Sequence, residues 1–364
     1  MQILAFHLPQ FHPIPENDAW WGKGFTEWTN VTRARPVVPG HYQPHLPADL
    51  GFYDLRLPEA RDAQADLARQ YGIDGFVYYH YWFNGKRVLE RPVDEILASG
   101  KPDFPFCLCW ANENWTRAWD GRTGQNLLEQ HYSPEDDQAH IEALLPFLSD
   151  PRYVRVEGKP LLLIYRTELL PDPARTAALW REAAMRSGLG EICLARVESF
   201  VTGVDPASIG FDVAIEFAPD WRRLQKLRFS RMQKLMSRVG LFPKGYFEHR
   251  FVEYRDLVAG MQSKAIPSYR HYRCVTPGFD NSPRRKSDAT IIQNSTPEQY
   301  QGWLSKTLAD EMTMHAPAAQ LVFINAWNEW AEGNHLEPDQ RWGRAYLEAT
   351  RSAKANVLGQ AFPG

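Results

Sequence analysis

The chain has 364 residues, of which 44% are apolar and 23% are charged, a composition typical of a globular protein that works in water. Its formal net charge of −3 gives no reason to expect a nucleic acid as partner. The length suits one α/β barrel with long loops, and no run is long and apolar enough to be an integral membrane segment.

Apolar runs of strand length alternate with helical patterns along the chain. The predicted strands are Met1–Leu8, Gly75–Trp82, Phe104–Ala111, Pro160–Tyr165, Ile192–Val197, Asp212–Phe217, Tyr269–Val275 and Leu321–Trp327. The predicted helices are Pro58–Tyr71, Val93–Leu97, Pro134–Leu148, Ala174–Ser187, Arg250–Met261, Pro297–Met314 and Arg341–Ala355. This alternation predicts the α/β class and a single (β/α)8 TIM barrel over residues 1–364, with long strand-to-helix loops.

Two segments depart from the regular alternation. Residues 9–52 form a long loop rich in aromatic residues and proline. Residues 222–250, named here the basic insertion, contain nine Lys or Arg and one acidic residue, with apolar residues at near-helical spacing. The basic insertion fits a lid, a contact to an acidic glycan, a membrane-surface helix or an ordinary amphipathic surface helix, and the sequence leaves these four interpretations open.

The last predicted strand runs directly into Asn328-Glu329-Trp330-Ala331-Glu332. Barrel enzymes carry their acid and base groups at the carboxyl ends of the strands, and glycosidic bond cleavage needs two carboxyl groups beside one sugar ring. Tryptophan offers the flat apolar face on which a sugar stacks. We therefore predict that Glu329 and Glu332 are catalytic and that Asn328 and Trp330 bind substrate; alternatively, the two acids only open a following helix.

Four further clusters mix aromatic, amide, acidic and basic side chains, as polyol-binding sites do. One lies in the loop 9–52, one forms the end of the second predicted strand, and two follow the third and seventh predicted strands. The expected substrate-binding residues are Glu27, Trp28, His80, Tyr81, Trp82, Asn112, Glu113, Trp115, Arg117, Trp119, Asp280, Asn281 and Arg284. The alternatives are loops packed by their own aromatics, a satisfied core histidine, and an ordinary turn followed by solvated arginines.

We expect no metal and no cofactor. The chain has no Asp-x-Asp pair for a metal-bound nucleotide, no Gly-rich nucleotide loop and no Cys/His metal spacing. His41 and His45 are separated by prolines rather than aligned on a helix, and four cysteines read as buried free thiols, which suits a reducing compartment. The expected location is cytoplasmic if the chain is complete, while a periplasmic location stays open if it is a fragment.

The clusters together resemble the WbsX-like proteins of bacterial surface-polysaccharide loci, which are distant relatives of glycoside hydrolase family 99, the endo-α-mannosidases and mannanases. The resemblance covers nearly the whole chain. It rests on Leu8–His12, Trp20–Trp28, Tyr79–Trp82, Trp110–Trp119, Pro277–Arg284 and Asn328–Glu332. Two features depart from the pattern: His7 stands where relatives usually have tyrosine, and the basic insertion is not a family 99 feature.

The resemblance implies a (β/α)8 barrel and retaining hydrolysis without metal. It implies that Glu329 acts as base on the 2-hydroxyl of the sugar, giving a 1,2-anhydro intermediate, and that Glu332 is first acid and then base. The expected partner is an oligosaccharide or polysaccharide, and the oligomeric state stays open. A glycosyltransferase of O-antigen or capsule synthesis is the main alternative, and a non-catalytic glycan-binding module is the second.

Overall fold

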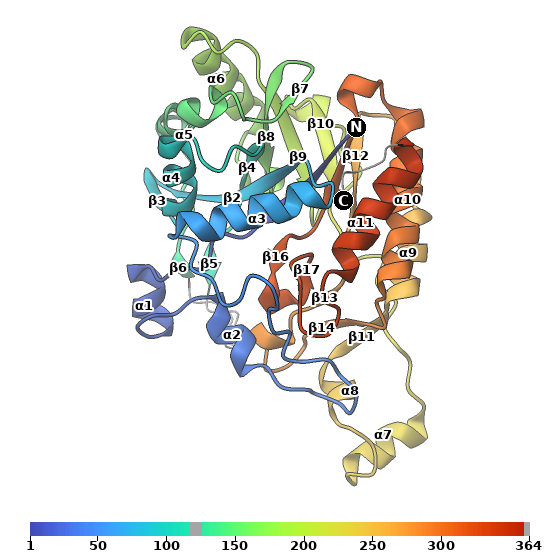
Figure 1. Cartoon of the computed structure of the whole chain (residues 1–364). Helices are drawn as coiled ribbons and strands as arrows, with labels where there is room; N and C mark the ends of the chain where they lie inside the picture. The colour runs from blue at the N-terminus through green and yellow to red at the C-terminus, as the bar shows by residue number, and fades with distance from the viewer. Residues whose placement is uncertain (117–125, 360–364) are drawn as a thin grey trace.

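A computed structural model describes residues 1–116 and 126–359 and contains a closed barrel of parallel strands (Figure 1). In order around the barrel the strands are β1 (Gln2–His7), β2 (Gly75–Phe83), β4 (Phe106–Trp110), β8 (Lys159–Ile164), β9 (Cys193–Glu198), β10 (Val213–Glu216), β12 (His271–Val275) and β15 (Leu321–Ile324). The barrel closes where Ile3 of β1 pairs with Val322 of β15. The eight-stranded barrel predicted from the sequence is confirmed.

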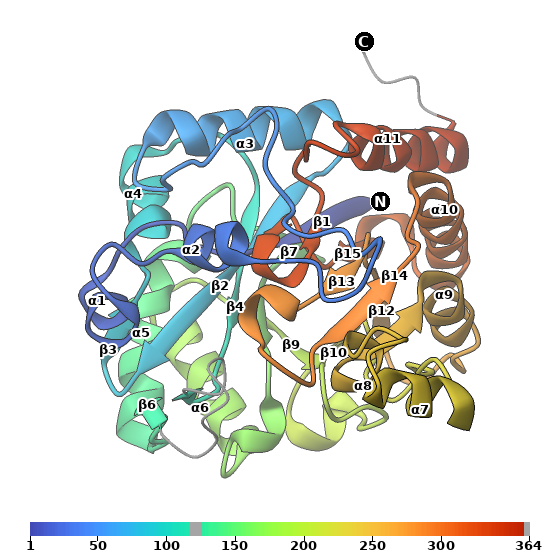
Figure 2. The same cartoon turned by 90° about the horizontal axis from the view of Figure 1, so that it is seen from below.

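Helices surround the strands, as the view from below shows (Figure 2). They are α3 (Pro58–Gln70), α4 (Arg91–Ser99), α5 (Pro134–Leu148), α6 (Pro173–Arg186), α9 (Tyr254–Gln262), α10 (Pro297–Met314) and α11 (Ala345–Leu358). Local sequence sets where they begin: Ser133 and Thr296 accept hydrogen bonds from the backbone of α5 and α10, and each helix has proline at its first position. In the part of the chain that the structure describes, no helix is long and apolar enough to cross a membrane.

The inside of the barrel is filled with aromatic side chains. The ring of Phe6 on β1 contacts the rings of Tyr79 on β2, Phe323 on β15 and Phe217, which directly follows β10. These four side chains are buried, so the barrel is a packed core and not a channel. The space above this layer, among the loops of the rim, is where barrels of this kind bind their ligands.

The sequence predicted one continuous helix over Arg250–Met261. This prediction is wrong for the start of the segment. Its first four residues form strand β11 (Arg250–Glu253), which pairs in parallel with β14 (Thr290–Gln293). The reason is local burial: Phe251 and Val252 are at most 1% exposed, and both pack in this small sheet beside the rim. The sheet is completed by β13 (Phe279–Asp280), which runs antiparallel to β14. This pairing fixes the position of the loop that follows β12.

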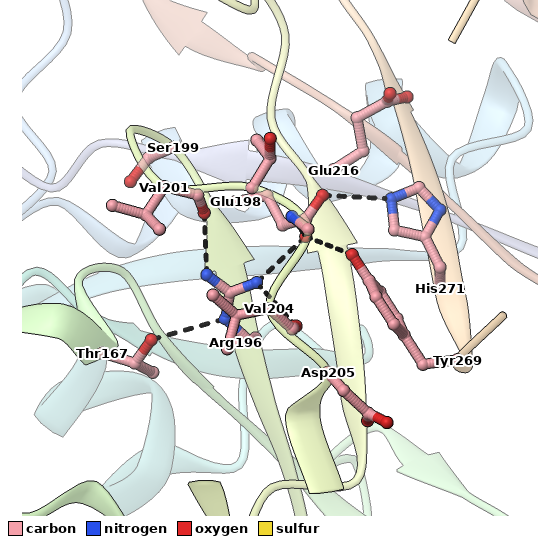
Figure 3. A network of polar contacts seen from close by, with 12 residues as sticks. Thr167, Arg196, Glu198, Ser199, Val201, Val204, Asp205, Glu216, Tyr269 and His271 are labelled. Carbon is pink, nitrogen blue, oxygen red and sulfur yellow. Dashed lines mark hydrogen bonds and ion pairs between the residues drawn. The ribbon is translucent and has the colours of Figure 1, made fainter. Parts of the chain in front are cut away.

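Between β9 and β10 the structure has only the 3₁₀ helix Pro206–Ile209, and a polar network covers this part of the barrel (Figure 3). Arg196 and Glu198 are 1% and 4% exposed, and their side chains are joined by a 2.9 Å hydrogen bond. Glu198 also accepts from the hydroxyl of Tyr269 at 2.8 Å and from the backbone N–H of Gly203 at 3.0 Å. Burial acts to raise the pKa of Glu198, but His271, Tyr269 and Gly203 together lower it to about 2.

We expect Glu198→Gln to lower the free energy of unfolding by roughly 3 kcal/mol at pH 7, since the buried Arg196 loses its counter-charge. The depressed pKa of Glu198 gives stability that is present above its ordinary value of 4.5 and is lost as the pH falls towards 2. The deficit of the variant should therefore shrink in that window. Urea unfolding at pH 7, 4 and 3 measures it. Glu182→Gln, which removes an exposed partner of Arg186, is the control, and equal losses in the two variants would contradict the assignment.

Candidate active site

Two glutamates lie together where the last barrel strand reaches the rim. Glu329 ends the short strand β16 (Asn328–Glu329), and Glu332 ends the 3₁₀ helix that follows it. Arg284 lies between their carboxylates: its Nη2 is 2.9 Å from Oε2 of Glu329, and its Nη1 is 2.6 Å from Oε1 of Glu332. One guanidinium thus fixes the positions of both carboxyl groups.

A third carboxylate joins this pair from the other end of the sequence. Glu27 is the first residue of α2 (Glu27–Arg33), and its Oε2 lies 3.1 Å from Nη2 of Arg284. Its side chain is fully buried, whereas the side chains of Glu329 and Glu332 are 9% and 24% exposed. Arg284 therefore holds three carboxylates that come from two distant parts of the chain. These four residues are named the Arg284 cluster below.

The charges of the Arg284 cluster do not balance if all three carboxylates are ionised. Burial raises the pKa of Glu27 and of Glu329, while the charge of Arg284 opposes the rise in both. Glu332 also contributes to the raised pKa of Glu27 and Glu329, because like charges in a dry site repel. Ionisation of all three carboxylates is therefore disfavoured, and carboxyl groups perturbed in this way are frequent at functional sites.

The Arg284 cluster borders a cavity of about 700 Å³, within the range of small-ligand sites. Tyr79 and Phe217, from the aromatic layer inside the barrel, line it from below. On another side Glu113 forms an ion pair with Arg166, and burial raises the pKa of Glu113 despite that pairing. Aromatic rings line much of the remaining wall: Trp20, Trp21, Tyr81, Trp115, Tyr165, Phe200, Trp221 and Phe279. Flat apolar surface next to carboxylates is the arrangement expected of a sugar site.

The structure brings part of the predicted set to this cavity. The predicted residues that line it are Tyr81, Glu113, Trp115, Asn281, Arg284, Glu329 and Glu332. Glu27 does not line the cavity and is paired with Arg284. Arg117 and Trp119 lie outside the described residues.

His80 and Trp82 point away from the cavity and towards the helices. His80 Nε2 lies 2.9 Å from Nε2 of His140 on α5, and the indole N–H of Trp82 donates to Asp136 at 3.0 Å. Side chains alternate along a strand, so Tyr81 faces inward and its two neighbours face outward. His80 and Trp82 therefore join β2 to α5 rather than contact a ligand in the cavity.

Asn112 and Asn328 hold loops in place through their amides. Asn112 accepts from the backbone N–H of Arg166 at 2.8 Å and donates to its carbonyl at 2.9 Å. Asn328 makes the same pair of bonds with the backbone of Leu8, at 2.7 and 3.0 Å. Both side chains are fully buried, so they fix the rim loops and have no free donor for a sugar.

Trp28, Trp330 and Asp280 also support the rim from outside the cavity. The indole of Trp28 donates to the carbonyl of Tyr53 at 2.8 Å, and the indole of Trp330 donates to Glu337 at 2.6 Å. Asp280 accepts from Gln43 at 2.6 Å and contacts His41 at 2.7 Å. Asp280 lines a neighbouring cavity of about 360 Å³. Asn281 and Arg284, in the connection between β13 and β14, line the 700 Å³ cavity instead.

Several residues that line the cavity were not among the predicted site residues. They include Gln10, Asn17, Trp20, Trp21, Tyr79, Tyr165, Trp221 and Arg285. Tyr165 directly follows β8, and Trp221 lies five residues after β10. Position after a barrel strand was the signal that would have found these two, since that position faces the functional rim.

The neighbouring cavity contains a histidine pair. Among the described residues, His45, His335 and Asp339 have ligand-type atoms within 4.8 Å of one another. His335 Nδ1 donates to the carbonyl of Glu337, so its Nε2 is a bare acceptor, 2.9 Å from Nδ1 of His45. Burial lowers the pKa of both histidines, to about 3 for His45, so a neutral hydrogen bond accounts for this contact.

Comparison with known proteins agrees with this architecture. Residues 3–350 match the family described as Glycosyltransferase WbsX. The chain is 48% identical over 351 residues to the protein named WxcX in two strains of Xanthomonas campestris pv. campestris. That match covers 96% of this chain and 49% of each relative, so the chain spans about half the length of these curated relatives.

Solved structures show the same fold at low sequence identity. A family 99 endo-α-mannosidase from Bacteroides thetaiotaomicron aligns with a TM-score of 0.56 and 15% identity over 98% of this chain and 98% of that one. A structure titled glycoside hydrolase-like protein aligns with a TM-score of 0.60 and 13% identity over 97% of this chain and 93% of the other. The chain thus shares the fold of these barrels, and by its match over residues 3–350 it belongs to the WbsX family.

Proposed function

We propose that this protein is a retaining glycoside hydrolase that acts on a bacterial surface polysaccharide. The observation that carries the proposal is the pairing of Glu329 and Glu332 on one guanidinium beside a cavity lined with aromatic rings. Two carboxyl groups beside a stacking surface are what cleavage of a glycosidic bond needs. The residues that line the cavity bind the sugars, with Trp115 and Tyr81 among the aromatic faces.

The proposed reaction has two steps. In the first, Glu329 takes the proton of the sugar's 2-hydroxyl, whose oxygen attacks the anomeric carbon, while Glu332 gives its proton to the departing glycosidic oxygen. The product is a 1,2-anhydro sugar. In the second, Glu332 takes a proton from water, whose oxygen bonds to the anomeric carbon as the bond between that carbon and the 2-oxygen breaks, and the 2-oxygen recovers its proton from Glu329. Two inversions give net retention.

The surroundings of the two carboxylates differ in a way that bears on the base role of Glu329. Glu329 is the more buried, at 9% side-chain exposure against 24% for Glu332, and burial raises its pKa. A carboxylate of raised pKa is a stronger base, which helps it to take a proton from a weakly acidic hydroxyl. Glu332 is on the more open side, where a leaving sugar can depart and a water molecule can enter.

A glycosyltransferase is the second candidate, and the description of the matched family favours it. Such an enzyme would take its sugar from a nucleotide sugar and pass it to a glycan hydroxyl. A glycan-binding module without catalysis is less well supported, because a site that only binds has no use for a cluster that retains a proton.

The test is to incubate the protein with bacterial O-antigen and capsule fragments and to measure new reducing ends with EDTA present. We expect cleavage that is independent of metal and of nucleotide, and thermal stabilisation by the fragment that is cleaved. Activity that is lost in EDTA, restored by manganese and dependent on a nucleotide sugar would instead identify a transferase. Stabilisation without any turnover would identify a binding module.

Glu27 should set the pH at which the hydrolase becomes active. The charge of Glu27 raises the pKa of Glu329, and protonated Glu329 cannot take the proton of the 2-hydroxyl. The acid limb of kcat/KM should therefore lie well above the ordinary glutamate value of 4.5. Glu27→Gln removes the repulsion and should move this limb to lower pH. An exposed carboxylate, changed in Glu298→Gln, is the control, and an unshifted limb in Glu27→Gln would contradict the coupling.

A further inference from the structure

The basic insertion carries a helix that stands away from the barrel. Helix α7 (Arg231–Arg238) lies at the same end of the molecule as β16 and β17 (Asn334–His335), and farther from the barrel strands than they do (Figure 1). The insertion is held by its own aromatic contacts: the ring of Phe229 packs against the rings of Phe242, Tyr246 and Phe247. The basic insertion is therefore anchored by the packing of its own aromatic residues, while the outer face of α7 is exposed.

The free face of α7 presents a stripe of apolar side chains. Met232 and Leu235 are 65% and 56% exposed, Val239 directly after the helix is 66% exposed, and Leu241 two residues farther on is 72% exposed. Residues spaced by three and four lie on one side of a helix. Four large apolar side chains within ten residues form a contiguous patch, and such patches on water-exposed helices mark a binding surface.

Cationic side chains flank the apolar stripe. Arg231, Lys234 and Arg238 are exposed along one side of it, and none of them forms an ion pair with any residue that the structure describes. The basic insertion has nine Lys or Arg against one acidic residue, whereas the whole chain has a net charge of −3. The positive charge is therefore concentrated in this segment and is not a general property of the surface.

We propose that α7 and Leu241 dock the protein onto the surface of an anionic lipid bilayer. The apolar stripe would enter the boundary between headgroups and acyl chains, and the cations beside it would meet the lipid phosphates. A protein partner would need an apolar groove and an acidic rim of matching shape. An anionic bilayer offers apolar acyl chains beneath anionic headgroups over its whole surface.

Docking in this way would also orient the Arg284 cluster. The cluster and α7 lie at the same end of the barrel, since β16 carries Glu329 and shares that end with α7 (Figure 1). The rim of the cavity would then face the bilayer, so glycans carried on the membrane would be close to it. The lipid interaction itself does not depend on the proposed hydrolase activity.

The test is sedimentation with neutral phosphatidylcholine vesicles and with vesicles that contain one quarter phosphatidylglycerol. We expect binding to the anionic vesicles only, weakening as salt is raised. Leu235→Ser with Val239→Ser removes half of the stripe, and Lys234→Gln with Arg238→Gln removes flanking charge. Each double variant should weaken partitioning by roughly tenfold or more. All four positions are exposed, and circular dichroism checks that the variants fold.

Met185→Ser is the matched control, because Met185 is 55% exposed but lies at the end of α6, away from the basic insertion. It should bind vesicles like the wild type. Equal binding of wild type to neutral and anionic vesicles, no binding to either, or unchanged binding of both double variants would overturn the proposal. So would a concentration-dependent dimer in light scattering that the Leu235 and Val239 changes abolish, since α7 would then join two copies of the chain.

Discussion

Glu329→Gln and Glu332→Gln should each bind the glycan nearly as well as the wild type and turn it over about 10²–10⁴-fold more slowly. Glutamine keeps the shape of glutamate and most of its hydrogen bonds, but it neither accepts the proton of the 2-hydroxyl nor protonates the leaving oxygen. The loss should appear in kcat rather than in the dissociation constant. The two roles act in the same step, so the double variant should be little slower than either single variant.

The measurement combines steady-state kinetics with the dissociation constant of each variant for the cleaved fragment. Glu298→Gln on the outside of α10 is the control and should match the wild type. Wild-type kcat in either catalytic variant would remove that glutamate from the mechanism. A variant that is slow only because it no longer binds would reassign the residue to substrate binding.

Arg284→Met should lower the free energy of unfolding by about 3–5 kcal/mol near neutral pH and abolish activity. It leaves Glu27, Glu329 and Glu332 without the cation that they share, and Glu27 has no exposed surface. Without Arg284 the pKa values of Glu27 and Glu329 rise further, because its charge lowers both of them in the wild type. Groups whose pKa is raised on folding destabilise the fold as the pH rises, so the deficit should be larger at pH 8 than at pH 5.

Urea unfolding at the two pH values measures this effect. The next residue offers a matched control, since Arg285 lines the same cavity but is exposed, and Arg285→Met should cost less than about 1 kcal/mol. A deficit for Arg284→Met that does not change with pH would show that the loss comes from packing alone and that the three carboxylates are not coupled through Arg284.

The barrel was predictable because its strands are short apolar runs between helices with clear start signals. The predicted helices Pro134–Leu148 and Pro297–Met314 match α5 and α10 at both ends, and proline after serine or threonine marks where each begins. Arg250–Glu253 was assigned to a helix because four residues are too few to distinguish the two periodicities. Its strand partner, β14, lies about forty residues away in the chain, where no local pattern shows it.

The direction of side chains was the harder part of the site. In β2 every residue from Gly75 to Phe83 is buried, so burial does not reveal which face points inward. Tyr79 and Tyr81 take the cavity side, and His80 and Trp82 take the helix side. A strand with both faces covered lacks the polar alternation that would have fixed this choice.

Polar residues after strands were found, but their roles depend on distant partners. Asn112 and Asn328 bond backbone groups of loops far along the chain, and Asp280 faces His41 instead of the cavity. Glu27 was predicted to bind substrate directly and instead supports Arg284, which lies 257 residues away. These contacts join residues that come together only when the barrel closes, so no single sequence motif predicts them.

The most direct test of the mechanism compares the cleaved fragment with the same fragment lacking the 2-hydroxyl at the scissile sugar. The proposed route predicts that the 2-deoxy fragment binds but resists cleavage, and that no covalent sugar adduct forms, because the oxygen that attacks belongs to the substrate. Turnover is measured by release of reducing ends, and adducts are sought by mass spectrometry of the quenched reaction. Rapid hydrolysis of the 2-deoxy fragment, or a glycosyl adduct on Glu329, would contradict it.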